Sequence, residues 1–136
     1  MGNEPELPLF AYGTLEIPEI IEALTGRAYT GRRAVLEDWA RYLLKDSEYP
    51  GGMPVKGAKI PGLIYEDFGE TALMLVDHYE GELYERLQLV VKDENGESVL
   101  CWVYVIRPER RDVLTDQEWD RETFIKNHLA SYLSEI

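Results

Sequence analysis

The segment from Ser98 to Arg107 constrains the fold most, because every residue from Val99 to Ile106 is apolar or aromatic. The pair Asn95-Gly96 precedes it, and Asn-Gly is the dipeptide most typical of a tight β-hairpin turn. The segment Arg86 to Lys92, on the other side of that turn, supplies the partner strand. Since a strand with two apolar faces must be covered on both, Ser98 to Arg107 is predicted to be a central strand of a sheet.

Further strands are predicted where short runs are rich in apolar, aromatic and β-branched residues. They are Leu7 to Tyr12, Tyr29 to Leu36, Trp39 to Lys45 and Ile60 to Tyr65. Between the last two, the segment Tyr49 to Pro54 holds two prolines and two glycines. Because Pro cannot donate to a strand ladder and Gly weakens a strand, this segment is predicted to be a loop, of the kind that often frames a binding site.

Apolar residues at helical spacing predict helices between these strands. The first covers Ile17 to Leu24, and Gly26 follows its end. The second covers Glu70 to Tyr79 and stops at Gly81, which places Glu80 at a helix C-terminus.

A third helix is predicted to begin at Thr115-Asp116-Gln117-Glu118, which has the pattern of a capping box. Its apolar stripe would pack on the sheet and consists of Ile125, Leu129, Tyr132, Leu133 and Ile136. Strands and helices together predict an α+β fold. The length of 136 residues is that of one domain, so residues 1–136 are expected to form a single unit.

The formal net charge of -12 argues against nucleic acid and anionic membranes as partners, because both carry negative charge. Basic residues gather only at Arg32-Arg33 with Arg41 and at Arg107 to Arg111. Acidic or apolar neighbours break both groups, so we interpret them as ordinary surface.

The lone Cys101 cannot form an internal disulfide and is predicted to be a buried small hydrophobe in a reducing compartment. The start, Met1 to Pro8, lacks the order of a signal peptide, and no apolar run approaches membrane-spanning length. These features predict a cytoplasmic protein.

The first candidate site is Tyr12-Gly13-Thr14-Leu15, where a predicted strand runs into a helix. Free backbone N–H groups gather at such a turn, and Gly13 lets a ligand approach the backbone, so the turn is suited to hold a carboxylate or a phosphate. The alternative is a plain strand-to-helix turn with Thr14 as its cap.

The second candidate site lies between Asp77 and Arg86, where acidic and aromatic residues crowd around Glu80. The helix dipole and an apolar wall from Tyr79 or Tyr84 would raise the pKa of Glu80 toward that of a general base. The alternative is an acidic helix end with Arg86 as its salt-bridge partner.

Other chemistries have weaker support in the sequence. His78 and His128 are too scattered for a recognisable metal site. A glycosidase pair of Asp77 and Glu80 would need a sugar cleft and a defined separation, which a sequence cannot supply.

Three linked motifs resemble those of the gamma-glutamylcyclotransferase-like family. They are Phe10-Ala11-Tyr12-Gly13-Thr14-Leu15, Pro61-Gly62-Leu63-Ile64-Tyr65-Glu66, and Val76-Asp77-His78-Tyr79-Glu80-Gly81 followed by Tyr84 and Arg86. The resemblance spans Leu7 to Ile106. It implies a compact β-barrel-like sheet of mixed parallel and antiparallel strands with flanking helices, and a cavity floored by the Tyr12 to Leu15 turn.

The resemblance also implies roles for these residues. Backbone amides of Gly13, Thr14 and Leu15 would hold the α-carboxylate of a gamma-glutamyl group, and Glu80 would be the catalytic acid and base. Tyr84 would line the cavity, and Arg86 matches the fingerprint without a defined role. Tyr12, Tyr84 and Arg86 are therefore expected among the substrate-binding residues.

The implied reaction is an intramolecular attack that releases 5-oxoproline and needs neither metal nor organic cofactor. The expected partner is a small gamma-glutamyl substrate, and the expected protein is a monomer or a weak homo-oligomer. Two other functions stay open at this point: a non-catalytic module that binds a small carboxylate in the same cavity, and a protein-binding scaffold with an acidic surface.

Overall fold

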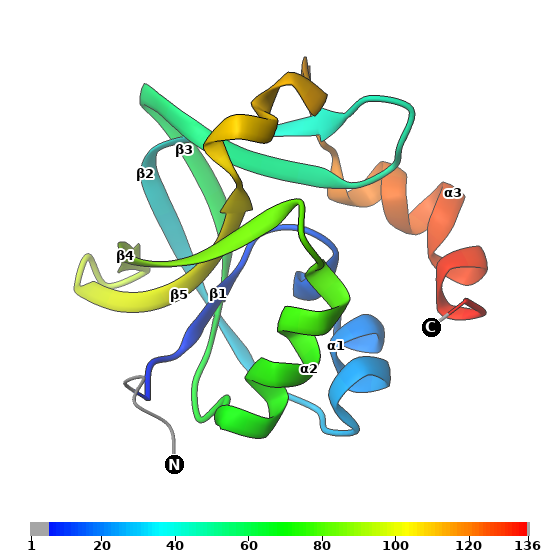
Figure 1. The fold of residues 1–136 in the computed structure, drawn as a ribbon. Helices are drawn as coiled ribbons and strands as arrows, with labels where there is room; N and C mark the ends of the chain where they lie inside the picture. The colour runs from blue at the N-terminus through cyan, green and yellow to red at the C-terminus, as the bar shows by residue number, and fades with distance from the viewer. Residues whose placement is uncertain (1–5, 136) are drawn as a thin grey trace.

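The computed structural model describes residues 6–135 (Figure 1). The start of the predicted polar N-terminal segment and Ile136 of the predicted apolar stripe lie outside these residues. The described part contains six strands and three α-helices with two short 3-10 turns. In chain order they are β1 (Leu9–Ala11), η1 (Thr14–Glu16), α1 (Pro18–Thr25), β2 (Gly31–Leu44), β3 (Pro50–Tyr65), α2 (Glu70–Glu80), β4 (Tyr84–Asp93), β5 (Ser98–Ile106), η2 (Pro108–Val113), β6 (Leu114–Glu118) and α3 (Arg121–Leu133).

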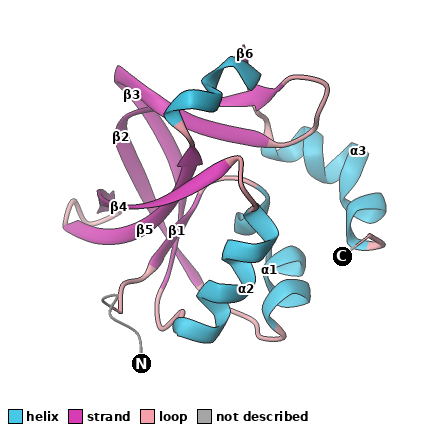
Figure 2. Ribbon diagram, in the orientation of Figure 1, coloured by secondary structure: helices cyan, strands magenta, loops and turns pink. Residues whose placement is uncertain are grey.

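The strands form a closed barrel. Their order is β3-β1-β5-β4-β2, and β2 pairs again with β3 to complete the circle, while β6 extends β2 outside it. The pairing of β1 with β5 is parallel, and the other pairings are antiparallel. Figure 2 shows the helices outside the strands, with α1 and α2 next to each other. The predicted α+β class and the mixed barrel with flanking helices are confirmed.

The apolar strand β5 is central, as predicted. It lies between β1 and β4, and its side chains enter two core clusters on opposite faces. Trp102 and Tyr104 belong to one cluster, whereas Cys101 and Val103 belong to the other. The Asn-Gly hairpin joins β4 to β5, and Gly96 adopts a φ of +81° in its turn. Both faces of β5 are buried from Cys101 to Ile106, so this part of the strand contributes to both halves of the core, whereas Leu100 near its start is exposed.

Two predictions about β2 and β3 were wrong. The two strands predicted between Tyr29 and Lys45 are one strand, β2, which bulges at Asp38, a residue with a φ of +67°. The segment predicted to be a loop, Tyr49 to Pro54, instead begins β3 and pairs with β2 as far as Leu43↔Pro50.

The glycines in this part of β3 have a packing function that only the fold reveals. A Cβ atom on Gly51 would collide with the Ile106 side chain, and one on Gly52 would lie 3.1 Å from the Tyr12 hydroxyl. Glycine at these positions therefore lets large core side chains pack directly against the backbone of β3.

The predicted capping box was also wrong. Thr115 lies in β6, and its hydroxyl donates to the Leu43 carbonyl at 2.7 Å instead of capping a helix. The helix α3 begins at Arg121, where the carboxylate of Asp120 accepts the Thr123 N–H at 3.0 Å. The most deeply buried side chains of α3 are Phe124 and Tyr132. Ile125, Leu129 and Leu133 of the predicted stripe are partly buried against the same core.

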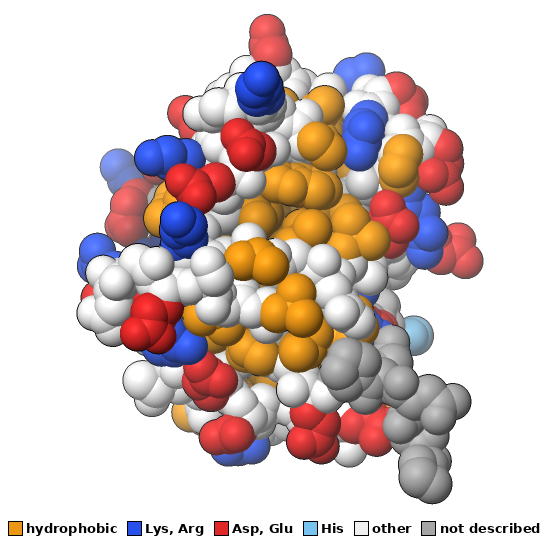
Figure 3. Space-filling model, turned by 90° about the vertical axis from the view of Figure 1, so that its left-hand side faces the viewer, with side chains coloured by type: hydrophobic (Ala, Val, Ile, Leu, Met, Phe, Trp, Pro, Cys, Tyr) orange, Lys and Arg blue, Asp and Glu red, His pale blue; other side chains and the backbone are white. Residues whose placement is uncertain are grey.

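On the face drawn in Figure 3, acidic and basic side chains are mixed toward the edges, and hydrophobic side chains gather at the centre. Arg32 is part of this mixed surface, because it pairs with Glu66 and with Asp93. Arg41 is not, since only 14% of its side chain is exposed, and its interpretation as ordinary surface was wrong. Among the helices of residues 6–135, none is both long and apolar enough to cross a bilayer.

Gly51→Ala tests the packing role of the Pro-Gly segment. Overpacking against Ile106 should lower the free energy of unfolding by about 2 kcal/mol. Urea unfolding measures the change, and Lys56→Ala at an exposed position of the same strand should stay within about 0.5 kcal/mol of wild type. Wild-type stability of Gly51→Ala would contradict the packing assigned here.

Candidate active site

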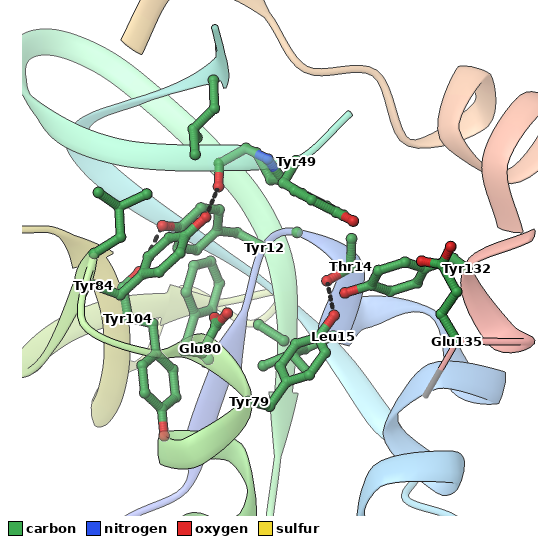
Figure 4. A pocket seen from close by; sticks show the side chains of 16 residues that line it. Tyr12, Thr14, Leu15, Tyr49, Tyr79, Glu80, Tyr84, Tyr104, Tyr132 and Glu135 are labelled. Atoms are coloured by element: carbon green, nitrogen blue, oxygen red, sulfur yellow. Dashed lines mark hydrogen bonds between the residues drawn. The ribbon is translucent and has the colours of Figure 1, made fainter. Parts of the chain in front are cut away.

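A cavity of about 440 Å³ opens where the ends of β1, α2 and α3 come together (Figure 4). Its walls are largely aromatic, with six tyrosines and one phenylalanine. The lining consists of Phe10, Ala11, Tyr12, Gly13, Thr14, Leu15, Leu44, Tyr49, Pro50, Tyr79, Glu80, Leu83, Tyr84, Tyr104, Tyr132 and Glu135. The two candidate sites of the sequence therefore meet in one cavity.

The residues of the turn after β1, Gly13 to Leu15, all line this cavity. The Glu16 N–H donates to the Gly13 carbonyl, and the Ile17 N–H donates to the Thr14 carbonyl, both at 3.1 Å. The N–H groups of Gly13, Thr14 and Leu15 take no part in these bonds of the turn. A Cβ atom on Gly13 would lie 2.7 Å from the Pro50 ring, so this position needs glycine.

Tyr79 links the turn to the end of α2. Its hydroxyl lies 3.1 Å from the Thr14 hydroxyl, across 65 positions of sequence. Tyr79 directly precedes Glu80, so this contact brings the second motif up to the first (Figure 4).

Glu80 is the last residue of α2, half-buried, with its carboxylate on the cavity wall. Within residues 6–135, no hydrogen bond or ion pair engages that carboxylate. Burial without a cationic partner raises the pKa of Glu80 to about 8. Near neutral pH, such a group can both take up and return a proton.

Two tyrosines that line the cavity are held by hydrogen bonds. The Tyr12 hydroxyl donates to the Tyr104 carbonyl at 2.5 Å and accepts the Gly52 N–H at 2.9 Å. The Tyr84 hydroxyl donates to the Pro50 carbonyl at 2.7 Å. Burial, with a contribution from the Glu80 charge, raises the pKa of both phenols, so both stay protonated.

Arg86 does not line this cavity. Its Nε donates to Asp77 Oδ1 at 2.8 Å, and its Nη2 donates to Asp77 Oδ2 at 3.1 Å. Its guanidinium also lies 4.2 Å from the centre of the Trp102 ring. The Tyr104 hydroxyl donates to the same carboxylate, so both Asp77 oxygens accept hydrogen bonds. The salt bridge considered for this helix end is therefore made by Asp77, while Glu80 has no ion-pair partner in the described part of the chain.

The other residues weighed in the sequence lie apart from the cavity lining. Asp77 is absent from the lining, so it does not form an acid pair with Glu80 there. His78 is exposed on α2, while His128 on α3 packs against Phe124 with ring centres 5.9 Å apart.

Several lining residues had no signal as site residues in the sequence. Tyr132 was assigned to the core stripe, and it does pack on Phe124, yet its ring also reaches the cavity beside Tyr49. Glu135 and Tyr104 likewise enter the lining only through the fold. The lining contains no Lys, Arg or His among the described residues, so a bound anion would depend on N–H and hydroxyl donors.

Comparison with known proteins agrees with the motifs. A family model described as gamma-glutamyl cyclotransferase, AIG2-like, matches residues 9–121. The chain belongs to this family.

Individual members and structures give the same result. AIG2-like protein D of Arabidopsis thaliana is 27% identical over 127 residues, which cover 92% of this chain and 83% of that protein. A solution structure from Arabidopsis thaliana superposes with a TM-score of 0.74 at 26% identity, over 99% of this chain and 82% of that one. A structure titled gamma-glutamyl cyclotransferase shares the fold, with a TM-score of 0.68 at 17% identity over 95% of this chain and 85% of that one. Family membership supports a cyclotransferase-like enzyme that acts on a small molecule.

The raised pKa of Glu80 predicts a pH-dependent effect on stability. Between about pH 4.5 and pH 8 the unfolded chain carries an ionised Glu80 and the folded chain a protonated one, so wild type loses stability as the pH rises. Glu80→Gln is neutral throughout and should be more stable by about 2 kcal/mol at pH 8, after allowance for solvent in the cavity.

Thermal unfolding at pH 4 and pH 8 measures this difference, which should vanish at the lower pH. Glu82→Gln, at an exposed carboxylate two residues away, is the matched control and should change stability little at either pH. Equal stability of Glu80→Gln and wild type at pH 8 would contradict the burial effect.

Proposed function

We propose that this AIG2-like protein is a gamma-glutamyl cyclotransferase in which Glu80 is the general acid and base. One observation carries the proposal: the Glu80 carboxylate, which burial brings to a pKa of about 8 and which has no partner among residues 6–135, shares a cavity with the Gly13 to Leu15 turn. The N–H groups of these three residues take no part in the hydrogen bonds that form the turn. One group is suited to move a proton, and the other is suited to hold an anion.

In the proposed reaction, the N–H groups of Gly13, Thr14 and Leu15 bind the substrate α-carboxylate. The substrate α-amine then attacks the γ-carbonyl carbon, and a C–N bond closes a five-membered ring. Glu80 takes a proton from the attacking nitrogen and delivers one to the departing nitrogen as the old C–N bond breaks. The products are 5-oxoproline and a free amine.

Positioning would supply much of the rate, because the nucleophile and the electrophile belong to one molecule. The aromatic walls from Tyr12 and Tyr84 support this role, since they exclude water and hold Glu80 in a poorly solvated place. No redox step or external nucleophile is required by the balance of the reaction.

The leaving amine is proposed to lie on the side of Tyr49 and Pro50, which belong to the segment predicted to frame a site. A reducing, cytoplasmic location also stays part of the proposal, in keeping with the buried free thiol of Cys101.

Glu80→Gln tests the catalytic role. Incubation with a panel of gamma-glutamyl amines and dipeptides should release 5-oxoproline with wild type, and the variant should lose about 10³-fold or more in kcat, in line with the loss of a general acid and base. Glu82→Gln should keep wild-type activity. Full activity in a folded Glu80→Gln variant would refute the assignment. Binding of 5-oxoproline without any turnover by wild type would favour the non-catalytic carboxylate-binding module.

The pH profile tests the protonation state. Because Glu80 must be ionised to accept the amine proton, kcat/KM should rise about tenfold per pH unit up to an apparent pKa near 8. The deprotonation of the substrate amine adds a second rise to the same curve. Steady-state rates from pH 5 to pH 10 measure the curve. A limb between pH 4 and pH 5 would mean that Glu80 titrates as an ordinary solvated carboxylate.

A further inference from the structure

Arg41 lies directly behind the turn that lines the cavity. It extends from β2, and its Nη1 donates to the Tyr12 carbonyl at 2.7 Å. The same nitrogen lies 3.6 Å from Oε2 of Glu16, a buried residue at the other end of the turn. Its guanidinium lies 5.2 Å from the centre of the Trp119 ring, which supports it from the side. Arg41 therefore contacts the residues on both flanks of Gly13 to Leu15 while it is absent from the cavity lining.

The hydrogen bond to Tyr12 has a consequence across the peptide plane. The peptide between Tyr12 and Gly13 is planar and trans, so its carbonyl and its N–H point in opposite directions. A donor that holds the carbonyl on the outer side therefore directs the Gly13 N–H toward the side on which Gly13 lines the cavity. The bond is charge-assisted, so it resists rotation of the peptide better than a neutral one would.

The charges around the cavity make this orientation important. Within the described residues, the lining offers no cationic side chain, and it contains two carboxylates, Glu80 and Glu135. A substrate carboxylate could not be held by charge there. Its binding would depend on how well the backbone N–H groups of the turn are aimed.

We propose that Arg41 is a positioning residue that aims the Gly13 amide at the substrate α-carboxylate. This rests on the proposed function, because it assigns the turn to that carboxylate. The carboxylate is bound alike in the ground state and the transition state. Loss of the hydrogen bond from Arg41 to the Tyr12 carbonyl should therefore raise KM and leave kcat nearly unchanged.

Arg41→Met removes the donor and keeps much of the side-chain volume. KM for a gamma-glutamyl amine should rise about tenfold with kcat within about threefold of wild type, and the Kd of 5-oxoproline by calorimetry should rise by a similar factor. Arg41→Lys keeps one donor that can reach the Tyr12 carbonyl, so it should restore part of the affinity.

Arg121→Gln is the matched control. Arg121 pairs with Glu16 at 3.2 Å but makes no contact with the Tyr12 carbonyl. A purely structural role of the ion pairs around Glu16 would lower stability in both variants and leave both KM values unchanged. The proposal requires a raised KM in Arg41→Met alone.

Amide signals of ¹⁵N-labelled protein provide a measurement without turnover. The Gly13 resonance should shift in Arg41→Met and stay in place in Arg121→Gln. A wild-type Gly13 signal together with a wild-type KM in Arg41→Met would overturn the inference, although the cyclotransferase assignment would survive. Failure of wild type to bind 5-oxoproline or to release it would instead overturn the proposed function.

The inference can also be tested on wild type alone, without any variant. If Arg41→Met does not fold, titration of labelled wild type with 5-oxoproline decides the matter. The Gly13 amide and the Arg41 side-chain N–H signals should then move together along the titration. Movement of Gly13 with an unchanged Arg41 signal would overturn the inference.

Discussion

The short strand β1 is the constraint on which the site depends. Its residues Leu9–Ala11 are buried and lie between β3 and β5, so they are held by hydrogen bonds on both sides. The Tyr12 hydroxyl then bridges a β5 carbonyl and a β3 amide. Because the chain is fixed up to this residue, the turn that follows cannot drift, and its amides keep a defined direction.

The opposite wall of the cavity is fixed by a different means. Asp77, one turn before Glu80 on α2, is held by the Arg86 side chain from β4 and the Tyr104 hydroxyl from β5. These polar contacts engage Asp77, whereas Glu80 has no partner among residues 6–135. The fold thus keeps a poorly solvated carboxylate at this position, which is the kind of local instability that functional sites often retain.

The elements set by local sequence could be predicted, including the hairpin at Gly96, the burial of most of β5 and the position of Glu80 at the end of its helix. The predictions that failed concern residues whose structure depends on partners far away in the sequence. Gly51 looked like a loop residue because the Ile106 side chain that needs its space is far along the chain. Thr115 matched a cap, yet the Leu43 carbonyl competes for its hydroxyl. Nothing in the sequence indicated that the Arg41 side chain would donate to the Tyr12 carbonyl. Closure of the barrel followed only from the family resemblance, because hydrophobic periodicity reports buried faces and not strand order.

Pro50 joins parts of the cavity that would otherwise be independent. Its ring leaves no room for a side chain at Gly13, while its carbonyl accepts the Tyr84 hydroxyl. A change at this proline would move the Gly13 to Leu15 turn and the aromatic wall at the same time. Under the proposed function, attempts to broaden the range of accepted amines by altering Pro50 would therefore also weaken binding of the glutamyl portion, and compensating changes would have to be sought on both sides at once.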